Sequence, residues 1–160
     1  MGDFELLVLA RVLHVSGVVM WIGGVAFVTT VLIPSLRKTT DADQRLALFE
    51  QLEGRFGLQA KLTTLITGVS GYYMLETLNA WDRYLHPQFW WMHLMTVVWG
   101  IFTLVLFVLE PLVLHRWFHQ QAVKNSERAF VWLHRMHQGL LSLSLIAVFG
   151  AVAGANGYAF

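Results

Sequence analysis

Histidine is the residue type in this chain best suited to hold a metal. The sequence has seven histidines and no cysteine, so thiolate metal sites, iron–sulfur clusters and disulfides are excluded. His14 and His93 each lie in a long stretch without charged residues, where a histidine usually has a partner or a function. Two imidazoles on different helices can supply both axial ligands of a b-type haem. We therefore predict a haem site at His14 and His93, with a hydrogen bond between helices as the competing interpretation.

Small and aromatic residues beside these histidines would shape such a site. Gly17 and Trp21 follow His14 by three and seven residues, so they lie near its helix face. Gly100 follows His93 by seven residues. A glycine on the face of a histidine leaves room for a flat macrocycle, and close helix packing is the alternative explanation. The residues assigned to the predicted cofactor pocket are Gly17, Trp21, Gly100 and Tyr72.

A second group of histidines lies further along the chain, at His115, His119, His134 and His137. The first two are four residues apart and the last two are three apart, so each pair shares a helix face. His115 and His93 would be about 33 Å apart along one helix, so no single metal could use both groups. His115 and His137 are the predicted ligands of a second haem or metal. Histidines that contact lipid phosphates at the membrane interface are the alternative.

Met92, His93 and Met95 offer a different chemistry. Thioether sulfur and imidazole nitrogen suit Cu(I), so a copper transport or resistance protein is the second functional hypothesis. Methionine also fills gaps in packed cores, which is the structural interpretation of the same residues.

Glu110 is a carboxylate inside an otherwise apolar stretch, where a charge is costly. We predict a salt bridge from Glu110 to Lys61 or Arg135 across the bundle. Quinone binding and proton transfer are the alternatives for this residue.

The composition indicates the surroundings in which these residues act. Hydrophobic residues make up 56% of the chain and charged residues 13%. A soluble domain has about 25% charged residues, so this chain is predicted to be an integral protein of the lipid bilayer. The net charge of +1, with no basic stripe, argues against a nucleic-acid partner.

Uncharged runs divide the chain into four predicted transmembrane helices near residues 5–34, 57–78, 89–116 and 131–156. The predicted fold is therefore an all-α four-helix bundle, a single domain over residues 1–160. The segment 40–56 is expected to be a helix extension or an interfacial amphipathic helix. Basic residues concentrate in the first and third connections, which predicts both termini on the periplasmic side of a bacterial inner membrane.

The run from His14 to Gly23, with the pattern His-x6-Trp-x-Gly, resembles the first helix of the CopD/HemJ-like membrane superfamily. Pro34 and Arg37 continue the similarity. That group includes the copper-resistance protein D family and the HemJ-type protoporphyrinogen oxidases. The resemblance covers roughly the first two-thirds of the chain and implies that His14 is a haem ligand.

Two later runs extend the comparison. Trp91-Met-His93 is similar to the start of the third helix of the oxidases, with Met95 where the oxidases have a lysine. The run Leu-His134-Arg-Met-His137 is similar to the bacterial di-haem cytochromes b, which are four-helix, quinone-linked electron carriers.

Three functions follow as expectations. The first is a b-type haem protein that transfers electrons between a quinone and a redox partner, with a haem-dependent porphyrinogen oxidase as a variant. The second is copper transport or resistance. The third is an accessory subunit of a membrane redox complex, with structural histidines. Gly150 and Gly154 predict close helix packing, either within the chain or in a homodimer.

Overall fold

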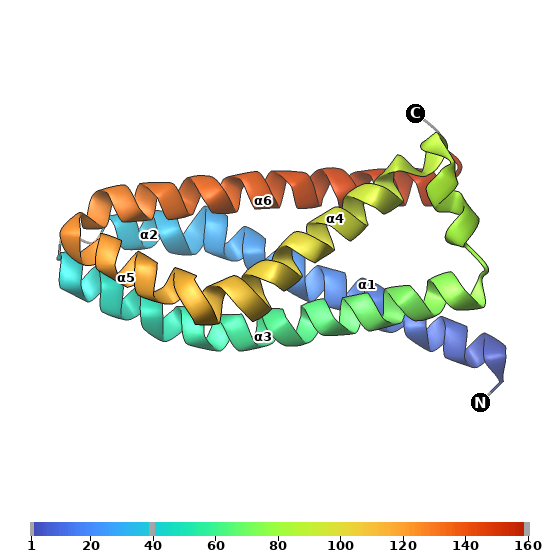
Figure 1. The fold of residues 1–160 in the computed structure, drawn as a ribbon, viewed down its shortest axis with the longest axis horizontal. Coiled ribbons are helices and arrows are strands. Elements are labelled where there is room, and N and C mark those ends of the chain that lie inside the picture. Colours follow the sequence, from blue (N-terminus) through green and yellow to red (C-terminus); the bar gives the residue numbers. More distant parts are fainter. Residues whose placement is uncertain (1, 39–40, 159–160) are drawn as a thin grey trace.

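The chain folds into long helices, as predicted, and the described residues contain no strand (Figure 1). The computed structural model describes residues 2–38 and 41–158, without the side chains of residues 113–115. The first rod comprises α1 (Asp3–Phe27), the π-helix η1 (Val28–Leu32) and α2 (Ile33–Arg37), and it is followed by α3 (Ala42–Thr77). Two 3-10 turns follow, η2 (Trp81–Leu85) and η3 (Pro87–Phe89). The remaining elements are α4 (Trp90–Leu104), the π-helix η4 (Val105–Leu114), α5 (His115–Lys124) and α6 (Ser126–Ala155).

Both chain ends lie at the same end of the molecule, beside the 3-10 turns, whereas α2 and α5 lie at the opposite end (Figure 1). We call these the outer end and the inner end. α1 packs along α3, and α4 packs on α6 and crosses the other helices obliquely (Figure 1).

Three helices are long and apolar enough to cross a membrane: Asp3–Arg37, Pro87–Leu112 and Ser126–Ala155. They contain most of the first, third and fourth predicted spans. The second predicted span, 57–78, corresponds to the outer half of α3, a helix that is not among these three. That helix begins at Ala42 because the Asp41 carboxylate accepts hydrogen bonds from the backbone amides of Asp43 and Gln44, at 2.9 and 3.1 Å. The segment before the span is therefore a helix extension.

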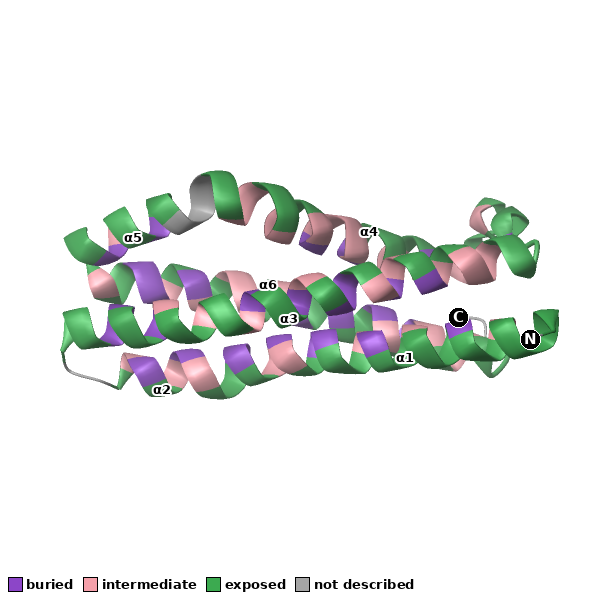
Figure 2. Ribbon diagram, turned by 90° about the horizontal axis from the view of Figure 1, so that it is seen from below, coloured by how far each residue is buried: buried purple, intermediate pink, exposed green. Residues whose placement is uncertain are grey.

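Both π-helices are associated with prolines. Pro34 follows η1 and Pro111 lies inside η4, and neither residue has the amide hydrogen that would close an α-helical turn. In η1 the hydroxyls of Thr29 and Thr30 also donate to carbonyls four residues back, at 2.6 and 2.7 Å. The rod formed by α4, η4 and α5 bends between its two α-helices (Figure 2).

Glycines of α6 allow it to pack closely on α4. A Cβ on Gly150 would lie 2.7 Å from the Trp90 ring, and a Cβ on Gly154 would overlap the indole of Trp91. This glycine pair therefore serves packing within the chain, the first of the two predictions made for it. It provides no support for a homodimer.

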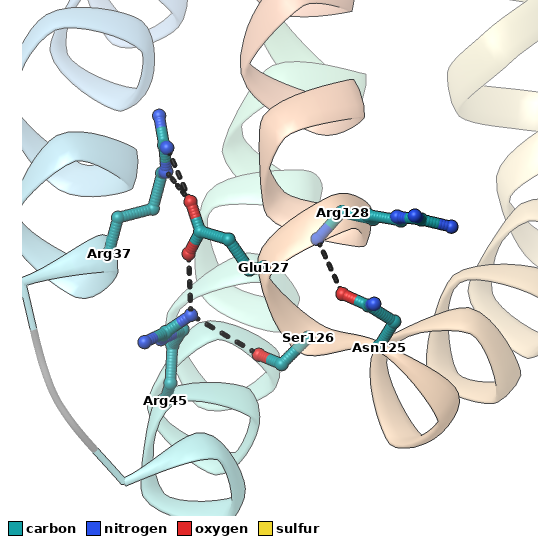
Figure 3. Close-up of polar contacts among 6 residues, drawn as sticks. All are labelled: Arg37, Arg45, Asn125, Ser126, Glu127 and Arg128. Carbon is teal, nitrogen blue, oxygen red and sulfur yellow. Dashed lines mark hydrogen bonds and ion pairs between the residues drawn. The ribbon is translucent and has the colours of Figure 1, made fainter.

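A polar cluster ties the helices together at the inner end (Figure 3). Glu127 at the start of α6 pairs with Arg37 of α2, and its other oxygen lies 3.3 Å from Arg45 Nη1 of α3. Arg45 is only 7% exposed, and its guanidinium lies 5.7 Å from the centre of the Phe130 ring. One phenylalanine each from α3 and α5 packs on that ring, with centroids 5.5 Å away. The cluster therefore covers an aromatic core.

The outward faces of the long helices are largely exposed (Figure 2). Many of these exposed side chains are large and apolar, such as Val19, Leu62 and Phe149. A surface of this kind suits hydrocarbon rather than water as its surroundings.

Candidate functional site

His14 lies between α1 and α3, and α3 fixes the orientation of its ring. The Nδ1 atom lies 2.9 Å from the backbone carbonyl oxygen of Thr67 and 3.4 Å from the Ser70 hydroxyl. Because a carbonyl oxygen only accepts, Nδ1 carries a hydrogen, and Nε2 of the neutral imidazole keeps a lone pair. Gly71 makes room for the ring, since a Cβ there would lie 3.0 Å from Cε1 of His14. Histidines that bind metals are commonly oriented in this way.

The space beside Gly17 is filled by α3. A Cβ on Gly17 would lie 2.6 Å from Thr67 Oγ1 and 3.3 Å from the Thr63 carbonyl oxygen, so this glycine serves close helix packing. Trp21 is 4% exposed and packs edge to face on Phe102, with ring centroids 4.9 Å apart. Its indole nitrogen has no hydrogen-bond partner among the residues that the structure describes. Trp21 is thus part of the core between α1 and α4.

His93 lies on the outer part of α4 and is exposed. Its Nε2 atom lies 3.0 Å from the carbonyl oxygen of Tyr84, and its ring packs edge to face on the Tyr84 ring at 5.1 Å. No atom lies within 4 Å of a Cβ placed on Gly100, so space is open beside that residue. Tyr72 is 58% exposed and packs on Trp81, with ring centroids 5.9 Å apart.

The two predicted axial ligands have separate surroundings. His14 contacts α3, whereas His93 contacts the turn η2. They also use opposite ring nitrogens for their carbonyl contacts, so only His14 keeps Nε2 for a metal. A haem with His14 as one axial ligand therefore stays a prediction, and so does the pairing with His93.

The proposed copper ligands are spread around α4. Met92 is 6% exposed and Met95 packs against the core, while His93 is exposed. The described residues also contain no group of three His, Cys, Asp or Glu side chains that could hold a metal ion. The burial of Met92 and the core packing of Met95 favour the structural interpretation of both methionines.

The inner histidines have different partners. His119 of α5 pairs with Glu50 of α3, with 2.7 Å between Nδ1 and Oε1. His137 of α6 donates from Nδ1 to the Leu133 carbonyl oxygen at 3.0 Å. The side chain of His115, the other residue predicted for a second site, lies outside the described residues.

A cavity of about 120 Å³ lies in the inner half of the bundle. Both π-helices border it, through Val28 and Leu32 of η1 and through Val105 and Leu106 of η4. π-Helical turns occur frequently at functional sites, because they displace side chains from the α-helical pattern. The titratable side chains that line the cavity are Glu53, Glu110 and His137.

Glu110 pairs with Lys61, which confirms the salt bridge predicted from the sequence. Lys61 Nζ lies 2.9 Å from Glu110 Oε2, although the ammonium is not directed at that oxygen as in a hydrogen bond. The other oxygen, Oε1, lies 3.7 Å from the position of a Cβ on Gly57. The absence of a side chain at Gly57 thus admits the carboxylate of η4 close to α3.

Glu53 is a site residue that sequence reasoning missed. It precedes the predicted span 57–78 and is largely buried. Burial, followed by the negative charges of Glu110 and Glu50, raises the pKa of Glu53 from 4.5 to about 7, against a smaller lowering by Lys61. A signal was present, because Glu50, Glu53 and Lys61 are spaced by three and eight residues and share a helix face.

Comparisons with protein-family models, curated protein sequences and solved structures found no match to this chain. The similarity to the CopD/HemJ-like superfamily accordingly stays a prediction from the run at residues 14–23. The features that indicate a function are the hydrogen bonds of His14 and the side chains that line the cavity.

Proposed function

We propose that this chain is an integral membrane protein that binds a b-type haem through His14 and transfers electrons between that haem and a quinone. Four spans in a bacterial inner membrane, with both termini on the periplasmic side, are part of the proposal. The observation that carries it is the 2.9 Å hydrogen bond from His14 Nδ1 to the Thr67 carbonyl oxygen.

That hydrogen bond prepares His14 for a metal in two ways. It places the hydrogen on Nδ1, which leaves Nε2 free to coordinate iron, and it orients the ring from the neighbouring helix. His14 is also half-buried between α1 and α3, and burial is one of the factors that tune a haem potential. When bound, the haem would supply one-electron redox chemistry, and His14 would supply an axial imidazole.

The inner cavity has the chemistry that a quinone head requires. Its walls are mainly apolar, and a small number of polar groups lie among them, as is typical of small-molecule sites. In its protonated form, the carboxyl of Glu53 can donate a hydrogen bond to a quinone carbonyl. His137 uses Nδ1 for the Leu133 carbonyl, so its Nε2 accepts a hydrogen bond from a quinol hydroxyl.

Two of the other functions share the haem site. A haem-dependent porphyrinogen oxidase and an accessory subunit of a redox complex would both keep His14 as ligand. Copper handling lacks a supporting contact, because Met92 is buried while His93 is exposed.

The test of haem binding is a reduced-minus-oxidised visible spectrum of the detergent-purified chain, with a pyridine haemochrome count. We expect the split α and β bands of a low-spin b haem, and their loss in His14→Ala. His86→Ala is the matched control, because His86 is an exposed histidine between η2 and η3. Loss of the low-spin bands in His93→Ala would identify the second ligand. A featureless spectrum from cells supplied with haem would contradict the proposal.

The quinone is tested separately with the haem-loaded protein. We expect a short-chain quinol to reduce the bound haem, and Glu53→Ala to slow this reduction while the haem content is unchanged. Equal rates in Glu53→Ala and the parent chain would remove the cavity from the proposal.

A further inference from the structure

A row of titratable side chains leads from the inner end of the molecule to the cavity. Glu50, Glu53 and Lys61 lie on one face of α3, and the first and last are about 16 Å apart along the helix axis. His119 of α5 pairs with Glu50 at 2.7 Å, and Glu110 of η4 pairs with Lys61 at 2.9 Å. The row is therefore assembled from α3 and from the consecutive elements η4 and α5, which are distant from α3 in sequence.

The two ends of the row have different surroundings. The side chain of His119 is 51% exposed and that of Glu50 31%, so the first pair is accessible at the inner end. Glu53 and Glu110 line the cavity. His137 is the titratable residue that α6 adds to the cavity wall, whereas the lining residues of α1 and η1 are all apolar: Val25, Val28 and Leu32.

Burial, together with the neighbouring carboxylates, allows Glu53 to exchange protons near neutral pH. Burial and the carboxylates of Glu50 and Glu110 disfavour the ionised form of Glu53, and Lys61 offsets this only in part. Its pKa of about 7 lets the carboxyl release and regain a proton under ordinary conditions.

The backbone around the row indicates a functional site independently of the charges. Glu110 lies in the π-helix η4, directly before Pro111, and the second π-helix, η1, borders the same cavity.

We propose that this row conducts protons from the inner end to a quinone bound in the cavity, and that Glu53 is the proton donor. The proposal rests on the function proposed above, because reduction of a quinone to a quinol consumes two electrons and two protons. In each transfer the carboxyl O–H bond of Glu53 breaks as an O–H bond forms on a quinone oxygen. The electrons come from the one-electron donor of the proposed function. Glu53 then regains a proton from water through His119 and Glu50.

The first test needs neither haem nor quinone. Infrared difference spectra of the purified chain, recorded on either side of pH 7, are expected to show the carbonyl band of a protonated carboxyl that titrates with a midpoint of about 7. Glu53→Gln should remove the band. Glu76→Gln is the matched control, because Glu76 is an exposed glutamate at the outer end of the same helix, and it should keep the band. Absence of a titrating band in the parent chain would overturn the proposal.

The second test follows the reaction. With the haem reduced beforehand and quinone in excess, Glu53→Gln should form quinol about a hundredfold more slowly than the parent chain, as expected for loss of a general acid. Glu53→Asp, which retains a carboxyl, should recover part of the rate. Glu50→Gln should slow the return of the proton to Glu53 after a pH jump at the inner end. Unchanged rates in both glutamine variants would also overturn the proposal.

The two proposals fail in different ways. A chain without a haem spectrum that still shows the infrared titration refutes the electron-transfer function and the quinone reaction, but keeps Glu53 as a proton-binding group. A normal haem spectrum without the titration refutes the proton row alone.

Discussion

A Cβ on Gly17 of α1 would lie 2.6 Å from the Thr67 hydroxyl of α3, so these two residues determine how closely the helices approach. The same hydroxyl donates to the Thr63 carbonyl oxygen at 2.8 Å, which holds it in this position. The backbone carbonyl of Thr67 orients His14. Helix packing and the geometry of the candidate ligand are therefore coupled through one residue.

Gly17→Ala is expected to lower the free energy of unfolding by about 1–3 kcal/mol, because the added methyl group forces α1 away from α3. The loss should occur although alanine is the better helix former. Thermal unfolding in a single detergent measures the effect. Gly23→Ala is the control, since no atom lies within 4 Å of a Cβ there. Adding Thr67→Ala should restore part of the loss, and equal stability of the two glycine variants would refute the explanation.

Glu110→Gln leaves the Lys61 ammonium without its counter-ion. The free energy of unfolding is expected to fall by about 1–3 kcal/mol. This is less than for a fully buried pair, because the two side chains are 30% and 26% exposed. The double variant Lys61→Met/Glu110→Gln should recover most of the stability, as measured by denaturant unfolding. If the double variant is no more stable than Glu110→Gln, the pair does not account for the loss.

Glu53 should make the stability of the chain depend on pH. Its folded pKa of about 7 lies above the ordinary 4.5, so the folded state binds the proton more tightly than the unfolded state. The contribution of this proton is fully present below pH 4.5 and is lost as the pH rises through 7. Melting temperatures across this window should therefore fall more steeply with pH for the parent chain than for Glu53→Gln. Parallel curves would contradict the assigned pKa.

Arg45→Met should destabilise the inner end by about 1–2 kcal/mol, through loss of the contacts to Phe130 and Glu127. Arg55→Met is the matched control, because Arg55 is an exposed arginine on the same helix. Hydrogen exchange of the amides at the start of α6 reports the effect locally. Equal exchange in the two variants would show that Arg45 does not hold this end together.

Uncharged runs predicted three of the helices well, because apolar length is what a membrane crossing requires. They described α3 less well, since its inner half carries the charged face that includes Glu50 and Glu53. The hydrogen-bond acceptor of His14 could not be predicted from the sequence, for a different reason. It is the backbone carbonyl of Thr67, and no pattern of side chains reveals which carbonyl a folded helix will present.

The spacing of the glycines did not reveal whether each one makes room for a cofactor or for a neighbouring helix. Gly17 lies on the face of His14 as expected, yet the position is occupied by Thr67 of the neighbouring helix. Conversely, the spacing of Gly150 and Gly154 correctly indicated close packing, and only the structure identified Trp90 and Trp91 as the partners. Both cases depend on contacts between helices, which a pattern within one helix does not contain.

The number of residues in the π-helix η4 determines how α5 is rotated about the helix axis relative to α4. Deleting one residue from Val105–Leu114 would rotate α5 about the helix axis relative to α4 and turn His119 away from Glu50. Exchanging a side chain in the same segment leaves this rotation unchanged. Insertions and deletions in η4 are thus expected to be tolerated less well than substitutions. The side chains that line the cavity can therefore vary while the backbone around it stays the same.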